Sequence, residues 1–225
     1  MQHTLFETTD EALKSLLDAL AIKNLPLSNA TLVGIGKESL GCAHFVATKL
    51  KIPLEFLFTQ IISAPLNSEC SIAAVSEDME IVMNEELVSA FGISLDYVYG
   101  EAQRRYEEAI LPARYQLRHG LGLEALRERD ILLFDMGIET GLRMSVAIKT
   151  CLNLGAKSIC PISPIMPKSI YEYLAEICDD VCCPHVLENY VSSAHYFPLL
   201  SPLSDEEFEN LLNQTPKTKE KYAAN

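Results

Sequence analysis

The stretch "ILLFDMGIETGLRMSVAIKTCLNLGAKSIC", residues 131–160, decides the fold of this 225-residue chain. It opens with an apolar run, which predicts a buried strand that ends at Asp135. A short loop with Gly137, Thr140 and Gly141 follows, and the apolar residues after it have helical spacing. The segment "SICPISPI" then predicts a further strand. A strand, a loop, a helix and a strand in this order are typical of a parallel sheet.

The same alternation occurs on both sides of this stretch. After an amphipathic helix at about Thr9 to Ile22, "ATLVGIG" predicts a strand, "SLGCAHFVATKL" a helix and "PLEFLFTQ" a strand. The central helix is expected from about Gly141 to Leu154, "KSIYEYLAEIC" adds a helix and "DDVCC" a strand. We therefore predict an α/β fold, a twisted and mostly parallel sheet with helices on both faces, in a single domain of residues 1–225.

A small hood, inserted at about residues 64–118, does not follow this alternation of apolar strands and helices. "CSIAAVSEDMEIVMNEELV" predicts an antiparallel hairpin around a polar turn at Ser76 to Asp78. "SLDYVYGEAQRRYEEAILPARYQL" predicts a charged amphipathic helix on which Arg104 pairs with Glu108. We expect the hood to cap the ends of the parallel strands, and we expect the tail at about 214–225 to be disordered.

The charge of the chain restricts its partners. With 31 acidic and 18 basic residues the net charge is -13, which repels nucleic acid and anionic membrane surfaces. No segment approaches the ~20 apolar residues of a membrane span, and the start has no signal-peptide pattern. We therefore expect a protein of the cytoplasm, with no nucleic-acid or membrane partner.

The seven cysteines are too irregularly spaced for a secreted disulfide framework, and we expect reduced thiols. Cys178, Cys182, Cys183 and His185 form the only cluster, in "EICDDVCCPH". This spacing has no second ligand pair, so we favour small apolar residues of a strand over a zinc site and predict no metal ligands. No serine, cysteine or histidine has a recognisable nucleophile setting, and the spacing of a Walker loop or a dinucleotide fingerprint is absent.

The loop after Asp135 has the chemistry of an anion site. Ligands of open α/β sheets gather outside the carboxyl ends of the strands, where unpaired N–H groups of helix N-termini attract anions. Thr140 can add its hydroxyl, and Asp135 can accept hydrogen bonds from sugar hydroxyls. A phosphate that carries a polyol fits this pattern. The alternative from the loop alone is an ordinary helix entry with Thr140 as the N-cap and Asp135 as a solvated strand end.

The loop and much of the chain resemble type I phosphoribosyltransferases. The family pattern has two adjacent acids and then T-G-x-T, and bacterial phosphoribosyltransferase-like proteins are closer, with "LVDDGIATGATM" at this place. The similarity extends to "FVATKL", "APLNSE", "SIAAV", "MNEEL", "AIKTCLNLGAKSICPISPIMP", "YVSSAHY" and "LSDEEF". The resemblance implies a twisted parallel sheet under a smaller hood that contacts the base.

This chain departs from the family pattern where pyrophosphate and ribose are bound. Met136 stands where the family has its second acid, and "ETGLR" replaces "ATGAT". The family loop "PRGG", which binds pyrophosphate through backbone amides, is "GKES" here, residues 36–39. The family Arg-Lys pair falls on Gln60 and Ile61. Since each well-placed donor lowers the barrier by about 3 to 4 kcal/mol, we expect phosphate binding to be retained and transfer to be weakened or lost.

The resemblance implies a protein that binds phosphoribosyl diphosphate, ribose 5-phosphate or a nucleotide, and that transfers ribose 5-phosphate to a base with Mg²⁺ if it is active. The alternative is an inactive descendant, a nucleotide sensor or protein-interaction module, and either is compatible with a homodimer. The expected ribose and 5-phosphate site comprises Asp135, Gly137, Glu139, Thr140, Gly141, Leu142 and Arg143. Lys37 and Ser39 are the candidates in the former pyrophosphate loop, where a solvated turn is the alternative for Lys37.

Two further expectations concern side chains near this site. The helix dipole disfavours a cation at Arg143, so we expect it to contact either a bound phosphate or Glu139. Tyr190, His195 and Tyr196 can stack on a base or fill a surface groove, and we favour packing.

Overall fold

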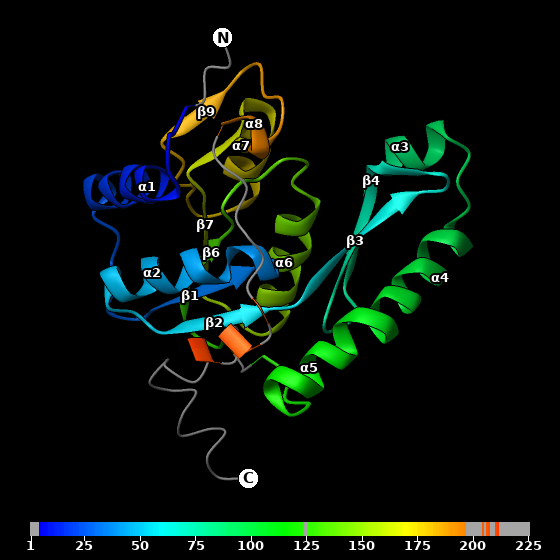
Figure 1. Ribbon diagram of the computed structural model, residues 1–225, viewed down its shortest axis with the longest axis horizontal. Coiled ribbons are helices and arrows are strands. Elements are labelled where there is room, and N and C mark those ends of the chain that lie inside the picture. The colour runs from blue at the N-terminus through cyan, green and yellow to red at the C-terminus, as the bar shows by residue number, and fades with distance from the viewer. Residues whose placement is uncertain (1–4, 124–125, 197–203, 205, 208–209, 212–225) are drawn as a thin grey trace.

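The computed structural model describes residues 5–123, 126–196, 204, 206–207 and 210–211. The tail for which the sequence predicts disorder, at about 214–225, lies outside this part of the chain. Within it, the predicted α/β architecture is confirmed: a parallel sheet lies between helices, and a second, antiparallel sheet projects from one side (Figure 1).

The parallel sheet has the strand order β2-β1-β6-β7. Its strands are β1 (Ala30–Ile35), β2 (Leu54–Leu57), β6 (Asp130–Phe134) and β7 (Ser158–Ile162). All six residues of β1 are buried, as expected for a parallel strand that is covered on both faces. β6 pairs with both β1 and β7, so the strand that ends before Asp135 is central, as predicted.

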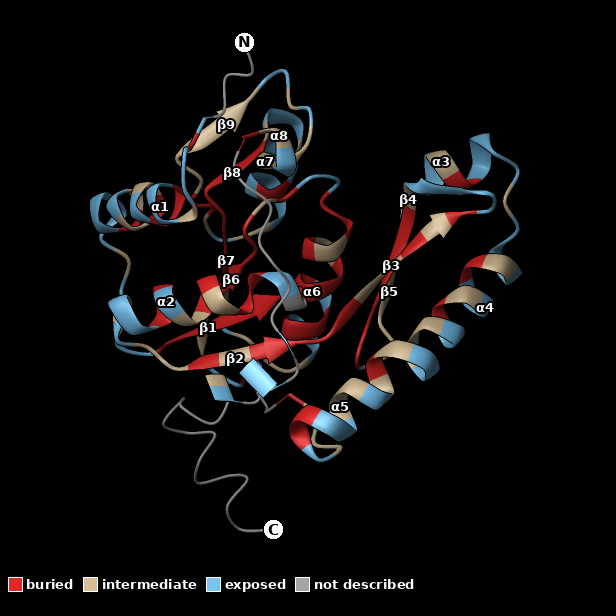
Figure 2. Ribbon diagram, viewed as in Figure 1, coloured by how far each residue is buried: buried red, intermediate tan, exposed pale blue. Residues whose placement is uncertain are grey.

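Helices cover both faces of this sheet. The residues of β1 and β6 alternate between two cores: Leu32 packs with α1 (Thr9–Lys23) and α2 (Leu40–Leu50), while Val33 packs with α6 (Leu142–Asn153) and α7 (Lys168–Ile177). Figure 2 shows this burial as red strands between helices whose outer sides are exposed. Among the described residues, no helix is both long and apolar enough to cross a membrane.

The chain after β7 differs from the prediction. "SICPISPI" divides into β7 and β8 (Ile165–Pro167), and β8 pairs with β9 (His185–Leu187). The predicted strand "DDVCC" is reduced to a single parallel bridge between Cys182 and Ile162. The Cys182 N–H donates to the Pro161 carbonyl (2.9 Å), and the Cys182 carbonyl accepts from the Ser163 N–H (3.1 Å). The carboxylates of Asp179 and Asp180 accept hydrogen bonds from backbone N–H groups beside this bridge. A short helix, α8 (Ser193–Tyr196), follows.

The hood is an antiparallel sheet of order β3-β4-β5 with a long helical run on its outer side (Figure 1). Its elements are β3 (Thr59–Ala64), β4 (Asn67–Ser76), β5 (Ile81–Met83), α3 (Glu85–Ala90), α4 (Leu95–Arg105), the π-helical turn η2 (Tyr106–Ile110) and α5 (Leu111–Arg118). The predicted pair between Arg104 and Glu108 is present, with 2.7 Å between Nη1 and Oε2. The predicted hairpin is the β4–β5 pair.

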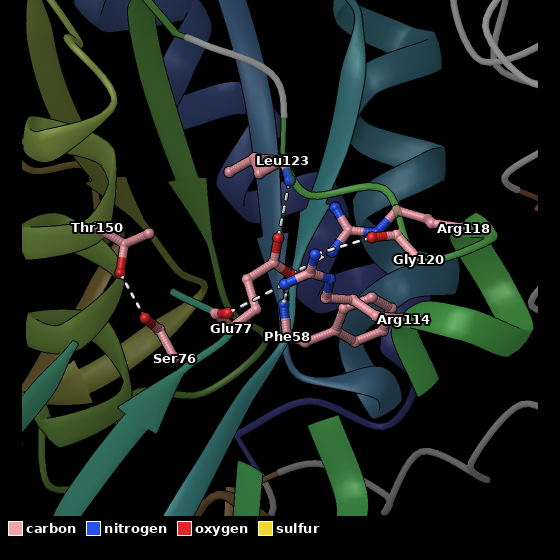
Figure 3. A network of polar contacts seen from close by, with 8 residues as sticks. All are labelled: Phe58, Ser76, Glu77, Arg114, Arg118, Gly120, Leu123 and Thr150. Atoms are coloured by element: carbon pink, nitrogen blue, oxygen red, sulfur yellow. Dashed lines mark hydrogen bonds and ion pairs between the residues drawn. The ribbon is translucent and has the colours of Figure 1, made fainter. Parts of the chain in front are cut away.

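The turn of that hairpin is not a solvated turn, because Ser76 and Glu77 are buried. The Glu77 carboxylate pairs with Arg118, which is equally buried, and accepts hydrogen bonds from the N–H groups of Phe58 (3.1 Å) and Leu123 (2.8 Å). The Arg118 guanidinium lies 4.6 Å from the centre of the Phe58 ring. Figure 3 shows how this network joins three segments at the root of the hood.

Glu77 also explains why the predicted strand "PLEFLFTQ" is two strands. Phe58 lies between β2 and β3, and its N–H donates to the Glu77 side chain while its C=O accepts from the Glu77 N–H (3.0 Å). The backbone of Phe58 is therefore engaged by the hood turn rather than by a neighbouring strand of the parallel sheet. The chain leaves the parallel sheet at this residue and enters the hood.

Removal of one partner of the buried pair should destabilise the protein more than removal of both. Glu77→Gln leaves the Arg118 charge buried without a carboxylate, which costs about 3 to 5 kcal/mol. Glu77→Gln combined with Arg118→Met removes both charges and should cost clearly less. Urea denaturation of the two variants and of wild type measures these differences, and a double variant at least as unstable as the single one would contradict the role of the pair.

Candidate functional site

The loops at the carboxyl ends of β1 and β6 lie side by side because the two strands are parallel neighbours. They border a cleft of about 360 Å³, and β3 and β4 of the hood form its opposite wall. The lining residues are Glu38, Ser39, Ile61, Ser71, Asp135, Met136, Gly137, Ile138, Glu139, Thr140, Gly141, Arg143, Met144 and Ser193. The cleft is thus located where ligands gather in open α/β sheets.

Most of the predicted site residues lie together in this cleft. Asp135 and Thr140 both line the cleft, as the predicted site requires. The other predicted residues that line it are Ser39, Gly137, Glu139, Gly141 and Arg143. Leu142 is an exception, since its side chain is buried against Ala74 and Val146. Lys37 belongs to the short helix η1 (Lys37–Ser39), and its side chain is not among those that the structure describes.

The N-terminus of α6 opens into the cleft. Gly141 precedes the helix in a left-handed conformation (φ 75°), which favours glycine, and no side chain of the described residues caps the helix. The predicted N-cap role of Thr140 is therefore absent, and Thr140 is exposed. The first-turn N–H groups of α6 remain available to an anion together with the helix dipole.

Asp135 is buried directly below this helix end. The Ser39 hydroxyl donates to Asp135 Oδ1 (2.9 Å), and Ser39 Oγ accepts from the Met136 N–H (3.2 Å). Burial raises the pKa of Asp135 to about 6, against the opposing effects of the Arg143 guanidinium and the Ser39 hydroxyl. The predicted alternative, a solvated strand end, is wrong for Asp135. Ser39 thus connects the two loops and also lines the cleft.

Arg143 pairs with Glu38 rather than with Glu139. Nη1 of Arg143 lies 2.5 Å from Oε1 of Glu38, and Arg143 Nε is buried without a hydrogen-bond partner among the described residues. Burial lowers the pKa of Arg143, but the carboxylates of Asp135 and Glu38 outweigh this and raise it. Burial also works to raise the pKa of Glu38, yet Arg143 brings it below its usual value. The expected pair with Glu139 is wrong because Glu38, from the neighbouring strand end, lies closer in space.

Glycine at position 36 makes room for this ion pair. Gly36 has φ 86°, and a Cβ there would lie 2.6 Å from Nη1 of Arg143. Glu139 has a different partner, since its Oε1 accepts from the Ser193 N–H (2.7 Å) and connects the loop to α8. In the sequence Glu38 stands out only as part of the stretch "GKES", and no local pattern indicates its partner 105 residues later.

The aromatic residues near the end of the chain are packed. Tyr196 is buried, its ring centre lies 5.3 Å from that of Tyr190, and its hydroxyl donates to the Asn189 carbonyl (2.9 Å). His195 contacts the Tyr196 ring edge to face, with 4.9 Å between the centres. These contacts agree with the packing role that the sequence favours.

The donors in the cleft do not fit Mg²⁺. The ion needs oxygen ligands and is usually held by one or two carboxylates with substrate phosphates. Asp135 is buried next to a guanidinium and its pKa is raised, Met136 offers no side-chain oxygen, and Glu38 is paired with Arg143. The structure describes no group of three or more His, Cys, Asp or Glu that could hold a metal ion.

Asp135→Asn should stabilise the protein at neutral pH. An acid whose pKa is higher in the folded than in the unfolded state destabilises the fold as pH rises through the two pKa values. For Asp135 these values are the ordinary 3.8 in the unfolded state and about 6 in the folded state. The ionised carboxylate therefore costs about 3 kcal/mol at pH 7, and asparagine resembles the neutral acid. Thermal unfolding should show a higher Tm for the variant at pH 7 and a vanishing difference near pH 4. Equal Tm values at pH 7 would show that the burial of Asp135 is not destabilising.

A solved protein shares this fold. Protein TT1426 from Thermus thermophilus is 21% identical with a TM-score of 0.73, and the match covers 93% of this chain and 98% of that chain. More distant structures are a purine phosphoribosyltransferase from Pyrococcus horikoshii (15% identity, TM-score 0.46, 87% and 91% covered) and a hypoxanthine phosphoribosyltransferase from Staphylococcus aureus (12%, 0.47, 84% and 80%). No family model matches the sequence. A parallel sheet with a smaller antiparallel hood is the architecture that the resemblance implied, and that expectation is confirmed.

Proposed function

We propose that the cleft binds a phosphorylated ribose, such as ribose 5-phosphate or a nucleoside monophosphate, and that transfer of the ribose 5-phosphate group is weak or absent. The uncapped N-terminus of α6 carries this proposal, because it opens into the cleft that Asp135 also lines. The 5-phosphate accepts hydrogen bonds from the N–H groups of Gly141, Leu142 and Arg143 and from the Thr140 hydroxyl. The ribose hydroxyls donate to Asp135.

This arrangement assigns Leu142 a role that its side chain does not reveal. Its side chain is buried in the small core between α6 and the hood, while its N–H belongs to the first turn of α6. A phosphate held by backbone amides tolerates changes of side chain, which accounts for a phosphate site that survives the loss of the family pattern.

The internal charges of the cleft oppose catalysis of transfer. A departing pyrophosphate needs donors and cations on the side of the former pyrophosphate loop. Glu38 places a carboxylate there and pairs with Arg143, and Met136 leaves Asp135 as a single acid beneath the ribose. We expect Mg²⁺ to contribute nothing to ribose 5-phosphate binding, because the donors of the cleft do not fit it.

Titration calorimetry with ribose 5-phosphate, pyrophosphate and unphosphorylated ribose tests the proposal. A like charge at about 4 Å costs about 1 to 4 kcal/mol, so Glu38 should make pyrophosphate bind at least about fivefold more weakly than ribose 5-phosphate. Ribose, which lacks the phosphate, should show no measurable binding. Pyrophosphate affinity equal to or above that of ribose 5-phosphate would contradict the proposed site.

Variants of the ion pair test whether Arg143 turns from Glu38 to the phosphate. Arg143→Ala removes a charge-assisted contact of about 1.5 to 3 kcal/mol, so ribose 5-phosphate should bind roughly 10- to 150-fold more weakly. Glu38→Gln removes the competing carboxylate of a partly exposed pair, a contribution of up to about 1 kcal/mol, so binding should tighten by up to about fivefold.

Glu139→Gln is the matched control, because it also removes one negative charge from the cleft but does not release Arg143. We expect a smaller gain in affinity for Glu139→Gln than for Glu38→Gln. Unchanged affinity in Arg143→Ala, or an equal gain in the two glutamate variants, would show that Arg143 does not contact the phosphate.

A further inference from the structure

A second cavity of about 430 Å³ lies on the other side of β3. We call it the β3–α5 chamber. It is bounded by the carboxyl end of β2, the start of β3, η2 and α5, and its lining residues are Gly36, Glu38, Phe56, Phe58, Thr59, Gln60, Ala109, Ile110, Pro112, Ala113, Gln116, Leu117 and Arg143. Its volume is within the usual range of small-molecule sites, about 300 to 1,000 Å³.

The chamber is separate from the phosphate cleft. Successive residues of a strand point to opposite faces, and accordingly Gln60 lines the chamber while Ile61 lines the cleft. Glu38 and Arg143 border both spaces, so their ion pair continues the partition that β3 begins.

The walls of the chamber combine apolar surface with uncharged polar groups. The apolar part includes Phe56, Ile110 and Leu117, and Gln60 adds an amide that can donate and accept. Apart from the Glu38–Arg143 pair, whose charges neutralise each other, the lining residues that the structure describes carry no charge. An ionic ligand would lose hydration and would gain a counter-ion only by breaking that pair, whereas an uncharged planar ligand leaves the pair intact.

Two observations indicate that the chamber is a ligand site and not a gap left by loose packing. The hydroxyl of Thr59 is buried in its wall without a hydrogen-bond partner among the described residues, a state that usually costs about 1 to 3 kcal/mol. The wall on the α5 side includes Ala109 and Ile110 of the π-helical turn η2. Such turns are rare in proteins as a whole, and those that occur are often located at functional sites.

Pro112 explains the local origin of η2. It has no N–H for the Glu108 carbonyl, and its ring crowds that carbonyl, so the helix widens before it. The Leu111 N–H instead reaches the carbonyl of Tyr106, five residues earlier. The sequence therefore places a π-helical turn in the wall of the chamber, and Pro112 itself is exposed.

We propose that the β3–α5 chamber is a second ligand site, which takes an uncharged planar heterocycle that both donates and accepts hydrogen bonds. The ring lies against the apolar wall of Phe56, Ile110 and Leu117. The Gln60 amide pairs with a donor and an acceptor of the ring, and rotation of the Thr59 side chain allows its hydroxyl a further hydrogen bond. This site does not depend on phosphate binding in the neighbouring cleft.

Calorimetric titration with two matched pairs of probes tests the proposal on the full chain. Nicotinamide and uracil are uncharged, while nicotinate and orotate are their carboxylate counterparts. At least one of the uncharged probes should bind with a Kd of about 1 mM or lower, and its counterpart should bind at least about tenfold more weakly. Failure of both uncharged probes to bind, or equal binding of the carboxylates, would overturn the proposal.

Two variants locate the binding in the chamber. Ala113→Leu fills it and should weaken binding of the uncharged probe at least about tenfold, while Ala90→Leu on the exposed side of α3 is the matched control and should change nothing. Gln60→Leu should weaken binding by roughly 5- to 150-fold, the effect of two hydrogen bonds. Unchanged binding in Ala113→Leu, with a Tm that shows a folded protein, would overturn the assignment.

Competition distinguishes this site from the phosphate cleft. Saturating ribose 5-phosphate should leave the uncharged probe bound, and Ala113→Leu should leave ribose 5-phosphate affinity unchanged. Displacement of the probe by ribose 5-phosphate would show that both occupy one site and would overturn a separate chamber. Failure of ribose 5-phosphate to bind would contradict the proposed function and leave the chamber assignment intact.

Discussion

The buried pair of Glu77 and Arg118 is the interaction on which the two ligand spaces depend. It closes the hairpin turn of the hood onto Phe58, the residue at which the chain leaves the parallel sheet. β3 begins directly after Phe58 and separates the phosphate cleft from the β3–α5 chamber. Because the Glu77 carboxylate accepts from the N–H groups of Phe58 and Leu123 as well as from Arg118, it joins the root of the hood to the end of the parallel sheet.

Much of the parallel sheet could be predicted from the sequence because its strands are short apolar runs between helical patterns. The helix at Thr9 and the helix after Gly141 were found within a residue or two, since apolar spacing and the glycine at the helix end mark them clearly. The break at Phe58 could not be found in this way, because its cause is a hydrogen bond that the Phe58 N–H donates to the Glu77 carboxylate, 19 residues later. "DDVCC" forms only one bridge, at Cys182, and the carboxylates of Asp179 and Asp180 bind backbone N–H groups beside it, which the apolar pattern does not show.

The site was predictable only as far as its local pattern extends. Asp135, Thr140 and Gly141 share one loop, so spacing alone brings them to one strand end. Glu38 comes from the neighbouring strand and meets Arg143 only after folding, which no local pattern shows. The same applies to Ile61 and Ser71, which the hood contributes from the opposite side. The burial of Asp135 was equally hidden, because it follows from Ser39 and the helix above it rather than from the apolar run before it.

The central claim is that the N-terminus of α6 holds the phosphate of a phosphorylated ribose. The backbone amide signals of residues 141–143 in a nitrogen-15-labelled sample report on this contact directly, because a hydrogen bond to phosphate shifts an N–H proton strongly. On titration with ribose 5-phosphate, we predict that the signals of Gly141, Leu142 and Arg143 move the most and that those of η2 and α5 remain in place. Saturable binding that leaves the signals of residues 141–143 unchanged would contradict the account.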